Sequence, residues 1–296
     1  MSDPDRSHAL LFEAAPYHDG RPQSGWRWPG RRRAAAYLLL AVLLTAGLLL
    51  VPLGSTLVIS LRGGESTYAE LWRQGQFGQA LLASVIWLAF APAVCAVGAV
   101  LAWLARAAPD RLRVVLRIAL VLPAVVSPMT TGVVFRLLFD AHPERGTVNA
   151  LLGGGVAFLG PGWVWLVLFL AFAWQWTGVA FLLFQGGMAR LPRDLLRMAR
   201  AYGVSRAGRL WAIVVPAMAP AATLAYLIVL VAAARVFDLV LAGAPGSMLS
   251  DVGGLGLYWW LHNVDLGDGP AAALAVVMSA VVAAFALPAL FGLRRG

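Results

Sequence analysis

Six long apolar segments most constrain what this chain can fold into. They are Ala34–Leu61, Ala80–Ala105, Ile118–Phe139, Trp163–Met188, Ala217–Ala242 and Pro270–Leu293. Each has at least 22 residues, and about 20 apolar residues suffice for a helix to cross the hydrocarbon core of a bilayer. A membrane β-strand would need only about 10 residues of alternating polarity, and these segments do not alternate. The sequence therefore predicts an all-α polytopic membrane protein with six transmembrane helices.

Charged residues are too few to cover a soluble surface. They make up 12% of the 296 residues, whereas soluble domains carry roughly 25%. All 23 basic residues are arginines, and 18 of them face the cytoplasm if the N-terminus lies there. Because cytoplasmic loops carry the excess of positive charge, we predict that both termini are cytoplasmic. The same bias, with attraction to anionic membrane lipid, accounts for the net charge of +9 without a nucleic-acid partner.

The loop between the fourth and fifth segments is unusually basic, with six arginines from Arg190 to Arg209. Pro192 suits the first turn of a helix, and Gly203 suits a left-handed stop at its end. Arginines and apolar residues between them occupy two different helical faces: Arg193, Arg197 and Arg200 on one, and Leu195, Met198, Ala199 and Tyr202 on the other. Ser205 is expected to cap the next helix. Such an amphipathic helix either lies in the lipid headgroups or docks into a groove on a partner protein.

The order L-P-x-x-L-x-x-x-A-x-x-x-G-x-S runs from Leu191 to Ser205 and is followed by Pro216. It resembles the signature loop of binding-protein-dependent ABC importer permeases, in which a short coupling helix sits in a cleft of the cytoplasmic ATPase. Arg197 stands where that family usually carries glutamate. The resemblance implies a coupling helix at about 192–203. It also implies that these residues couple the chain to the ATPase: Arg193, Arg197, Met198, Ala199, Tyr202, Gly203, Ser205 and Pro216.

Three further segments, Val133–Gly154, Arg235–Gly246 and Tyr258–Met278, resemble the sugar-importer branch of the same family. With the loop, the resemblance runs from Phe77 to Leu293 and implies the MetI-like type I permease fold in the plasma (inner) membrane of a bacterium. The implied organisation has three regions: a cytoplasmic tail over residues 1–33, a first transmembrane helix with its outer loop over 34–76, and the importer transmembrane domain, with helices two to six, over 77–293.

No ATP-hydrolysing or other catalytic site is expected in this chain. The sequence contains no lysine, so it cannot form the Walker A motif, whose lysine reaches the β- and γ-phosphates. The lone Cys95 and the four scattered histidines show no metal-ligand spacing. We therefore expect no enzymatic activity and no cofactor in this chain, with ATP bound by partner subunits. A membrane-embedded enzyme would need a convergent polar cluster, and the sequence shows none.

Two places are candidates for the substrate pathway. Gln175 lies between Trp174 and Trp176, and aromatic faces beside an amide donor suit a sugar. The same residues also suit a membrane-interface belt and interhelical packing. Arg235 and Asp238 are three residues apart, so on one helix they would share a face and pair. They are expected either to form a structural ion pair or to line the outer mouth of the pathway.

The resemblance implies a transmembrane permease subunit of an ABC importer for a sugar or sugar-like solute. Its implied partners are a second, homologous permease subunit, two cytoplasmic ATPase subunits and an extracytoplasmic solute-binding protein. A permease for a polyamine or an oxyanion is the nearest alternative. An ion-coupled secondary transporter is the alternative outside the family, and it usually shows inverted repeats and intramembrane acids.

Overall fold

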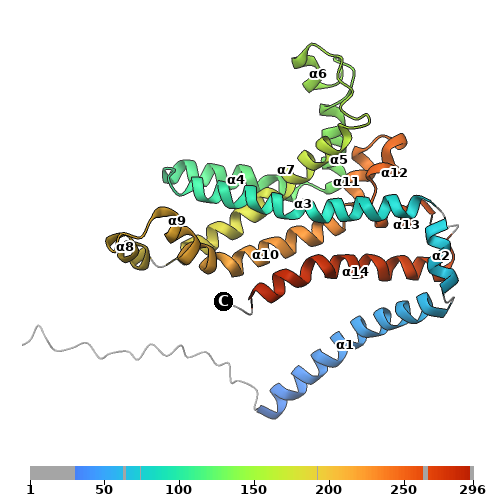
Figure 1. Cartoon of the computed structure of the whole chain (residues 1–296), viewed down its shortest axis with the longest axis horizontal. Helices are drawn as coiled ribbons and strands as arrows, with labels where there is room; N and C mark the ends of the chain where they lie inside the picture. Colours follow the sequence, from blue (N-terminus) through green and yellow to red (C-terminus); the bar gives the residue numbers. More distant parts are fainter. Residues whose placement is uncertain (1–30, 63–64, 74, 192, 263–265, 294–296) are drawn as a thin grey trace, which may run out of the picture. The chain divides into compact units, whose positions relative to one another are not determined.

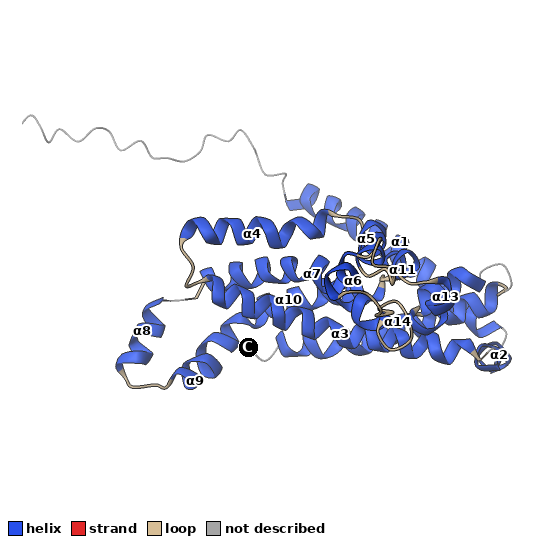
Figure 2. Ribbon diagram, turned by 90° about the horizontal axis from the view of Figure 1, so that it is seen from above, coloured by secondary structure: helices blue, strands red, loops and turns tan. Residues whose placement is uncertain are grey.

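The computed structural model describes residues 31–62, 65–73, 75–191, 193–262 and 266–293. All regular secondary structure in these residues is helical (Figure 2), which confirms the predicted all-α fold. The predicted N-terminal tail lies outside the described residues up to residue 30. The chain divides into two compact units, Met1–Pro52 and Leu53–Gly296. Helix α1 (Arg31–Arg62) runs through the boundary.

Five described helices are long and apolar enough to cross a membrane: Ala35–Arg62, Gln76–Ala105, Val164–Ala189, Arg206–Ala234 and Asp268–Leu290. They correspond to α1, α3 (Gln76–Ala105), α7 (Val164–Ala189), the α9-to-α10 stretch that ends with α10 (Val215–Ala234), and α14 (Asp268–Leu293). A sixth crossing is obtained if one strongly bent helix pair is counted as a single span. Four of the six predicted apolar segments thus lie in single long helices, and the fifth lies only partly in one.

The segment predicted as one span over Ile118–Phe139 is broken instead. It forms α4 (Asp110–Val125) and α5 (Pro128–Leu138), which are bent by 103° at the junction. The break follows from Pro128, because the residue before a proline is pushed out of the helical region, and Ser127 has an extended backbone with ψ 144°. The Ser127 side chain then accepts a hydrogen bond from the Thr130 N–H at 3.2 Å and so caps α5.

The fifth predicted segment, Ala217–Ala242, is also interrupted. Helix α10 ends at Ala234, a turn follows at Arg235 and Val236, and α11 covers Phe237–Gly243. This corrects the expectation that Arg235 and Asp238 lie on one continuous helix. Arg235 instead closes α10 with φ −106° and ψ 25°, and Asp238 sits in the first turn of α11, where a carboxylate is favoured by the helix dipole.

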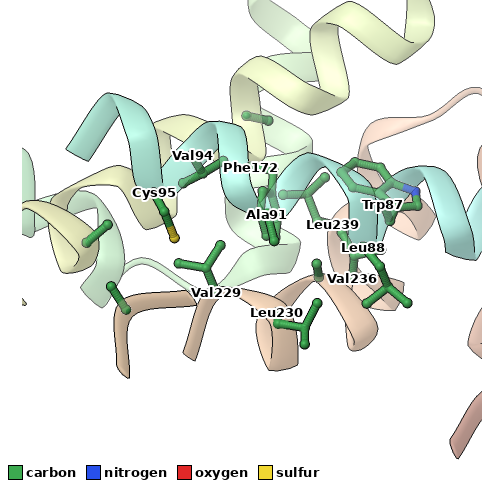
Figure 3. Close-up of a cluster of buried hydrophobic side chains, with 14 of the residues drawn as sticks. Trp87, Leu88, Ala91, Val94, Cys95, Phe172, Val229, Leu230, Val236 and Leu239 are labelled. Carbon is green, nitrogen blue, oxygen red and sulfur yellow. The ribbon is translucent and has the colours of Figure 1, made fainter. Parts of the chain in front are cut away.

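The core of the second unit forms where α3, α7 and α10 pack together. Figure 3 shows apolar side chains from these helices in contact, including Trp87 of α3, Phe172 of α7 and Leu230 of α10. Trp87 is fully buried, and its indole N–H donates to the Val252 carbonyl at 3.0 Å. Helix α4 packs on α7 at Gly178, where an added Cβ would lie 1.7 Å from the Leu120 carbonyl oxygen. Glycine therefore permits this close approach.

Short helices occupy the two ends of the bundle (Figures 1 and 2). At one end are α8 (Arg193–Ala201) and α9 (Arg206–Arg209), followed by a π-helical stretch at Leu210–Val214. Helices α2 (Glu65–Arg73) and α13 (Leu255–His262) lie at the opposite end. The remaining short helical elements are α6 (Thr147–Leu152), a 3-10 turn (Gly246–Met248) and α12 (Leu249–Val252).

Candidate functional site

Helix α8 forms at the predicted position and ends at the predicted glycine. It covers Arg193–Ala201, and Gly203 has a left-handed φ of +74°. The Val204 N–H donates to the Ala199 carbonyl at 3.0 Å, and the Gly203 N–H donates to the Arg200 carbonyl at 3.1 Å. This pair of bonds is the Schellman arrangement, which satisfies carbonyls at a helix C-terminus. The end of α8 is thus fixed by hydrogen bonds within the loop itself.

The following helix begins with the predicted cap. The Ser205 hydroxyl accepts a hydrogen bond from the Gly208 N–H at 3.0 Å, as an N-cap serine does. Arg209 donates from its guanidinium to the Val204 carbonyl. The joint between α8 and α9 is therefore closed on both sides by local bonds, which gives α8 a defined direction.

The apolar side chains of α8 divide between the bundle and the outside. Leu191, just before the helix, is buried, and Leu196 packs against the main core. On the other side Leu195, Met198 and Tyr202 are 42%, 52% and 86% exposed. The predicted apolar face is therefore present, and its exposed part does not pack on the described bundle. Such a face at the surface indicates a partner or a lipid contact.

The other residues predicted to couple the chain to the ATPase lie on α8 or at the start of α10. Arg197 is exposed and lies 3.4 Å from the Asp194 carboxylate one turn earlier, while Ala199 is half-buried. Pro216 lies in the first turn of α10, directly after the π-helical stretch Leu210–Val214. The backbone of Arg193 opens α8, and its side chain lies outside the described residues.

The predicted substrate residues in α7 have unequal surroundings. Trp174 is 43% exposed and contacts Phe135 of α5, with ring centroids 5.8 Å apart. Gln175 is 1% exposed, and its side-chain amide donates to the Val126 carbonyl at 2.7 Å. Its Oε1 has no hydrogen-bond partner among the described residues. Gln175 therefore satisfies a carbonyl at the break between α4 and α5, and it lines neither of two cavities found in the described bundle.

Arg235 and Asp238 do not form the ion pair that was one of the two alternatives for them, and the other, a place at the outer mouth of the pathway, stays a prediction. Both side chains are exposed, and no salt bridge joins them within the part of the chain that the structure describes. The turn at Arg235 and Val236 separates the two side chains onto different helices. The shared helix face that the three-residue spacing suggested is therefore absent.

The structure also shows a cleft that sequence reasoning missed. It has a volume of about 730 Å³ and lies at the α8 end of the bundle, between α3, α4, α7 and α8. Five arginines line it: Arg106, Arg113, Arg117, Arg197 and Arg200. The predicted topology puts the segment from Arg106 to Arg117 and the loop from Arg190 to Arg209 on the same, cytoplasmic side of the membrane, and this was the available signal. Their convergence depends on the packing of α4 against α7, which no local pattern predicts.

Taken together, five described helices long and apolar enough to cross a membrane, or six if the bent pair is one span, and a short amphipathic helix at one end are the features of a polytopic membrane protein. The family model described as "Binding-protein-dependent transport system inner membrane component" matches residues 96–291. The chain belongs to this family, and its predicted identification as a permease of this kind is confirmed.

Curated relatives of the chain are permeases. LacF of Rhizobium radiobacter, a lactose transport system permease protein, is 24% identical over 259 residues, which cover 82% of this chain and 86% of that protein. AraP of Halalkalibacterium halodurans, an arabinooligosaccharides transport system permease protein, is 25% identical over 61% of this chain and 59% of that protein. UgpA of Agrobacterium fabrum, an sn-glycerol-3-phosphate transport system permease protein, is 28% identical over 57% of this chain and 59% of that protein.

A solved structure shares the fold. The crystal structure of a bacterial ABC transporter involved in the import of the acidic polysaccharide alginate matches with a TM-score of 0.75 and 17% identity. The match covers 89% of this chain and 96% of that chain. The arrangement of helices is therefore that of an importer permease.

Proposed function

We propose that this chain forms the translocation pathway of an ABC importer and is itself not an enzyme. Separate ATPase subunits bind and hydrolyse ATP, since the chain has no lysine for a Walker A motif. Family membership over residues 96–291 supports this assignment. The observation that carries it is α8, a capped surface helix whose apolar face is left without a partner in the described bundle.

In this proposal α8 is the coupling helix. Leu195, Met198 and Tyr202 enter a groove on the ATPase, while the Schellman bonds at Gly203 hold the helix at a fixed angle. A rigid joint transmits movement, because a helix on a loose loop would move without displacing α7 and α10. Both chain termini and α8 then face the cytoplasm, as the excess of arginine on that side supports.

The remaining partners are a second, homologous permease subunit and an extracytoplasmic solute-binding protein. The matched alginate transporter has also been solved in complex with an alginate pentasaccharide-bound periplasmic protein, and a like arrangement is proposed here. Helix α1 has an exposed apolar surface, for example at Leu48, which is 75% exposed. Lipid or a neighbouring subunit covers such a surface in a bilayer.

The proposed solute is a sugar or a sugar-like compound. The relatives are named for lactose, alpha-glucosides, arabinooligosaccharides and sn-glycerol-3-phosphate, which share polyhydroxylated character and no single structure. A polyamine or an oxyanion is the alternative within the family. These names favour the sugar class over that alternative, and no described acidic cluster suits a polyamine.

The test is uptake by the natural host before and after deletion of the gene. Radiolabelled lactose, maltose, an arabinooligosaccharide and glycerol 3-phosphate are compared with spermidine and sulfate. We expect one of the first group to lose its high-affinity uptake and to regain it when the gene is restored. Loss of spermidine or sulfate uptake alone would contradict the sugar assignment.

A second arm separates ABC transport from ion-coupled transport. Uptake that stops with an inactivated partner ATPase but survives a protonophore in ATP-replete vesicles agrees with the proposal. Uptake that stops with the protonophore and is independent of ATP would show a secondary transporter.

A further inference from the structure

The cleft at the α8 end of the bundle concentrates positive charge. Its lining includes five arginines and no acidic residue. Gathering five cations around one space of about 730 Å³ costs Coulomb energy unless an anion shares that space. Only guanidinium groups whose N–H donors the protein does not already use are available to such an anion.

Two of the arginines are already engaged by the protein. Arg113 donates to the carbonyls of Ala105, Arg106 and Ala108 at 3.0 to 3.4 Å, and it also pairs with Asp110 at 3.1 Å. It therefore closes the C-terminal end of α3 onto the start of α4. Arg197 pairs with Asp194 on its own helix.

The other three keep free donors. Arg117 uses only its Nε, which donates to Gln185 Oε1 at 3.1 Å, so both of its terminal nitrogens are available. The guanidinium of Arg106 lies over the Trp103 ring at 5.0 Å, which leaves its edge open. The side chain of Arg200 makes no hydrogen bond or ion pair with another residue that the structure describes. These three groups come from α4, the end of α3, and α8.

We propose that this cleft binds a phosphate group through Arg106, Arg117 and Arg200. A guanidinium offers paired N–H donors that match the oxygens of a phosphate. A tetrahedral phosphate can accept from three such groups at once, whereas a planar carboxylate has only two oxygens to offer. The contacts of Gln185 and Trp103 hold two of the guanidinium planes in place before the ligand arrives, which lowers the entropic cost of binding.

Two sources carry this chemistry: the headgroup of an anionic phospholipid, and a water-soluble organic phosphate. Apolar side chains also line the cleft, among them Leu182, Met188 and Leu196, so the acyl chain of a lipid finds apolar contacts beside its phosphate. The proposal does not require α8 to bind an ATPase, so the two hypotheses fail independently.

The experiment uses the full chain in nanodiscs. In phosphatidylcholine discs, pyrophosphate binding is measured by calorimetry. In discs of mixed phosphatidylcholine and phosphatidylglycerol, native mass spectrometry measures which lipid the chain retains. The test variant carries Arg106→Gln, Arg117→Gln and Arg200→Gln. The control carries Arg111→Gln, Arg190→Gln and Arg206→Gln, which remove the same charge from exposed positions outside the cleft.

We expect at least one probe to bind and the test variant to bind it at least about tenfold more weakly, with the control within about twofold of the natural chain. Pyrophosphate binding alone would identify a soluble phosphate, and phosphatidylglycerol retention alone would identify a lipid headgroup. If the test variant is not monodisperse, probe binding is measured with the single variant Arg200→Gln, whose side chain is exposed. We expect this variant to bind the probe about threefold more weakly than the natural chain.

Equal losses in test and control variants would overturn the proposal, because they would show diffuse attraction to net charge. Failure of both probes to bind the natural chain would overturn it as well. Unchanged probe binding together with lost co-purification of the ATPase would instead assign the arginines to a protein contact.

Discussion

The α8 loop and the break between α4 and α5 both interrupt the long apolar helices, but they are stabilised in different ways. The α8 loop is closed by bonds among near neighbours, such as Val204 to Ala199 and Gly208 to Ser205. The α4–α5 break depends in addition on Gln175, which reaches Val126 from 49 residues away. One interruption is exposed and held by bonds within its own loop, and the other is partly exposed and held in addition by a buried side chain of a neighbouring helix. This difference indicates that the first can contact a partner, whereas the second serves the fold.

The largest effect is expected where α4 lies against α7. In Gly178→Ala the new Cβ would lie 1.7 Å from the Leu120 carbonyl oxygen, so α4 has to move away, at a cost of about 3 kcal/mol in the free energy of unfolding. Thermal unfolding followed by size-exclusion chromatography measures this loss. Gly186→Ala on the same helix meets no atom within 4 Å and is the matched control. Equal stability of both variants would show that the α4–α7 contact is not tight.

The next effect concerns the break itself. Gln175→Ala removes a buried amide and leaves the half-buried Val126 carbonyl without its donor, so we expect a loss of about 2 kcal/mol in the free energy of unfolding. Gln185→Ala removes a hydrogen bond in exposed surroundings and should cost less than about 0.5 kcal/mol. If Gln175→Ala keeps its stability but takes up less solute, Gln175 contributes to the substrate pathway and not to the fold.

In the exposed α8 loop a substitution at Gly203 is expected to cost less stability, because it strains only the backbone. Gly203→Ala places a side chain at φ +74° with no atom within 4 Å, so only the left-handed conformation is penalised, by about 1 kcal/mol. We expect nearly normal thermal stability and reduced uptake, because α8 loses its direction. Gly203→Asn tolerates this conformation better and should restore part of the uptake. If Gly203→Ala and Gly203→Asn transport equally well, the left-handed joint does not matter.

The same comparison explains what could be predicted from the sequence. The limits of α8, the conformation of Gly203 and the cap at Ser205 follow from residues a few positions apart, and the structure has all three. A single span was predicted over Ile118–Phe139; a proline disfavours a helical residue before it, but the 103° bend at Pro128 and the role of Gln175 depend on how α7 packs against α4. The expected pair of Arg235 and Asp238 failed for a related reason, since an unbroken helix was assumed where the chain turns. The arginine cleft was not predicted because its arginines come from two parts of the chain that are distant in sequence.

In the proposed importer, the exposed apolar face of α8 binds the ATPase. The direct measurement is the dissociation constant of the purified ATPase partner for the chain carrying Met198→Ser and Tyr202→Ser, with Leu151→Ser and Leu152→Ser in α6 as the control. The control removes two apolar side chains that are 83% and 60% exposed from a different surface.

We predict that the α8 variant binds the ATPase at least about tenfold more weakly, with its thermal stability unchanged, and that the α6 variant binds as the natural chain does. Undiminished binding by the α8 variant would contradict the account and return this helix to the lipid surface.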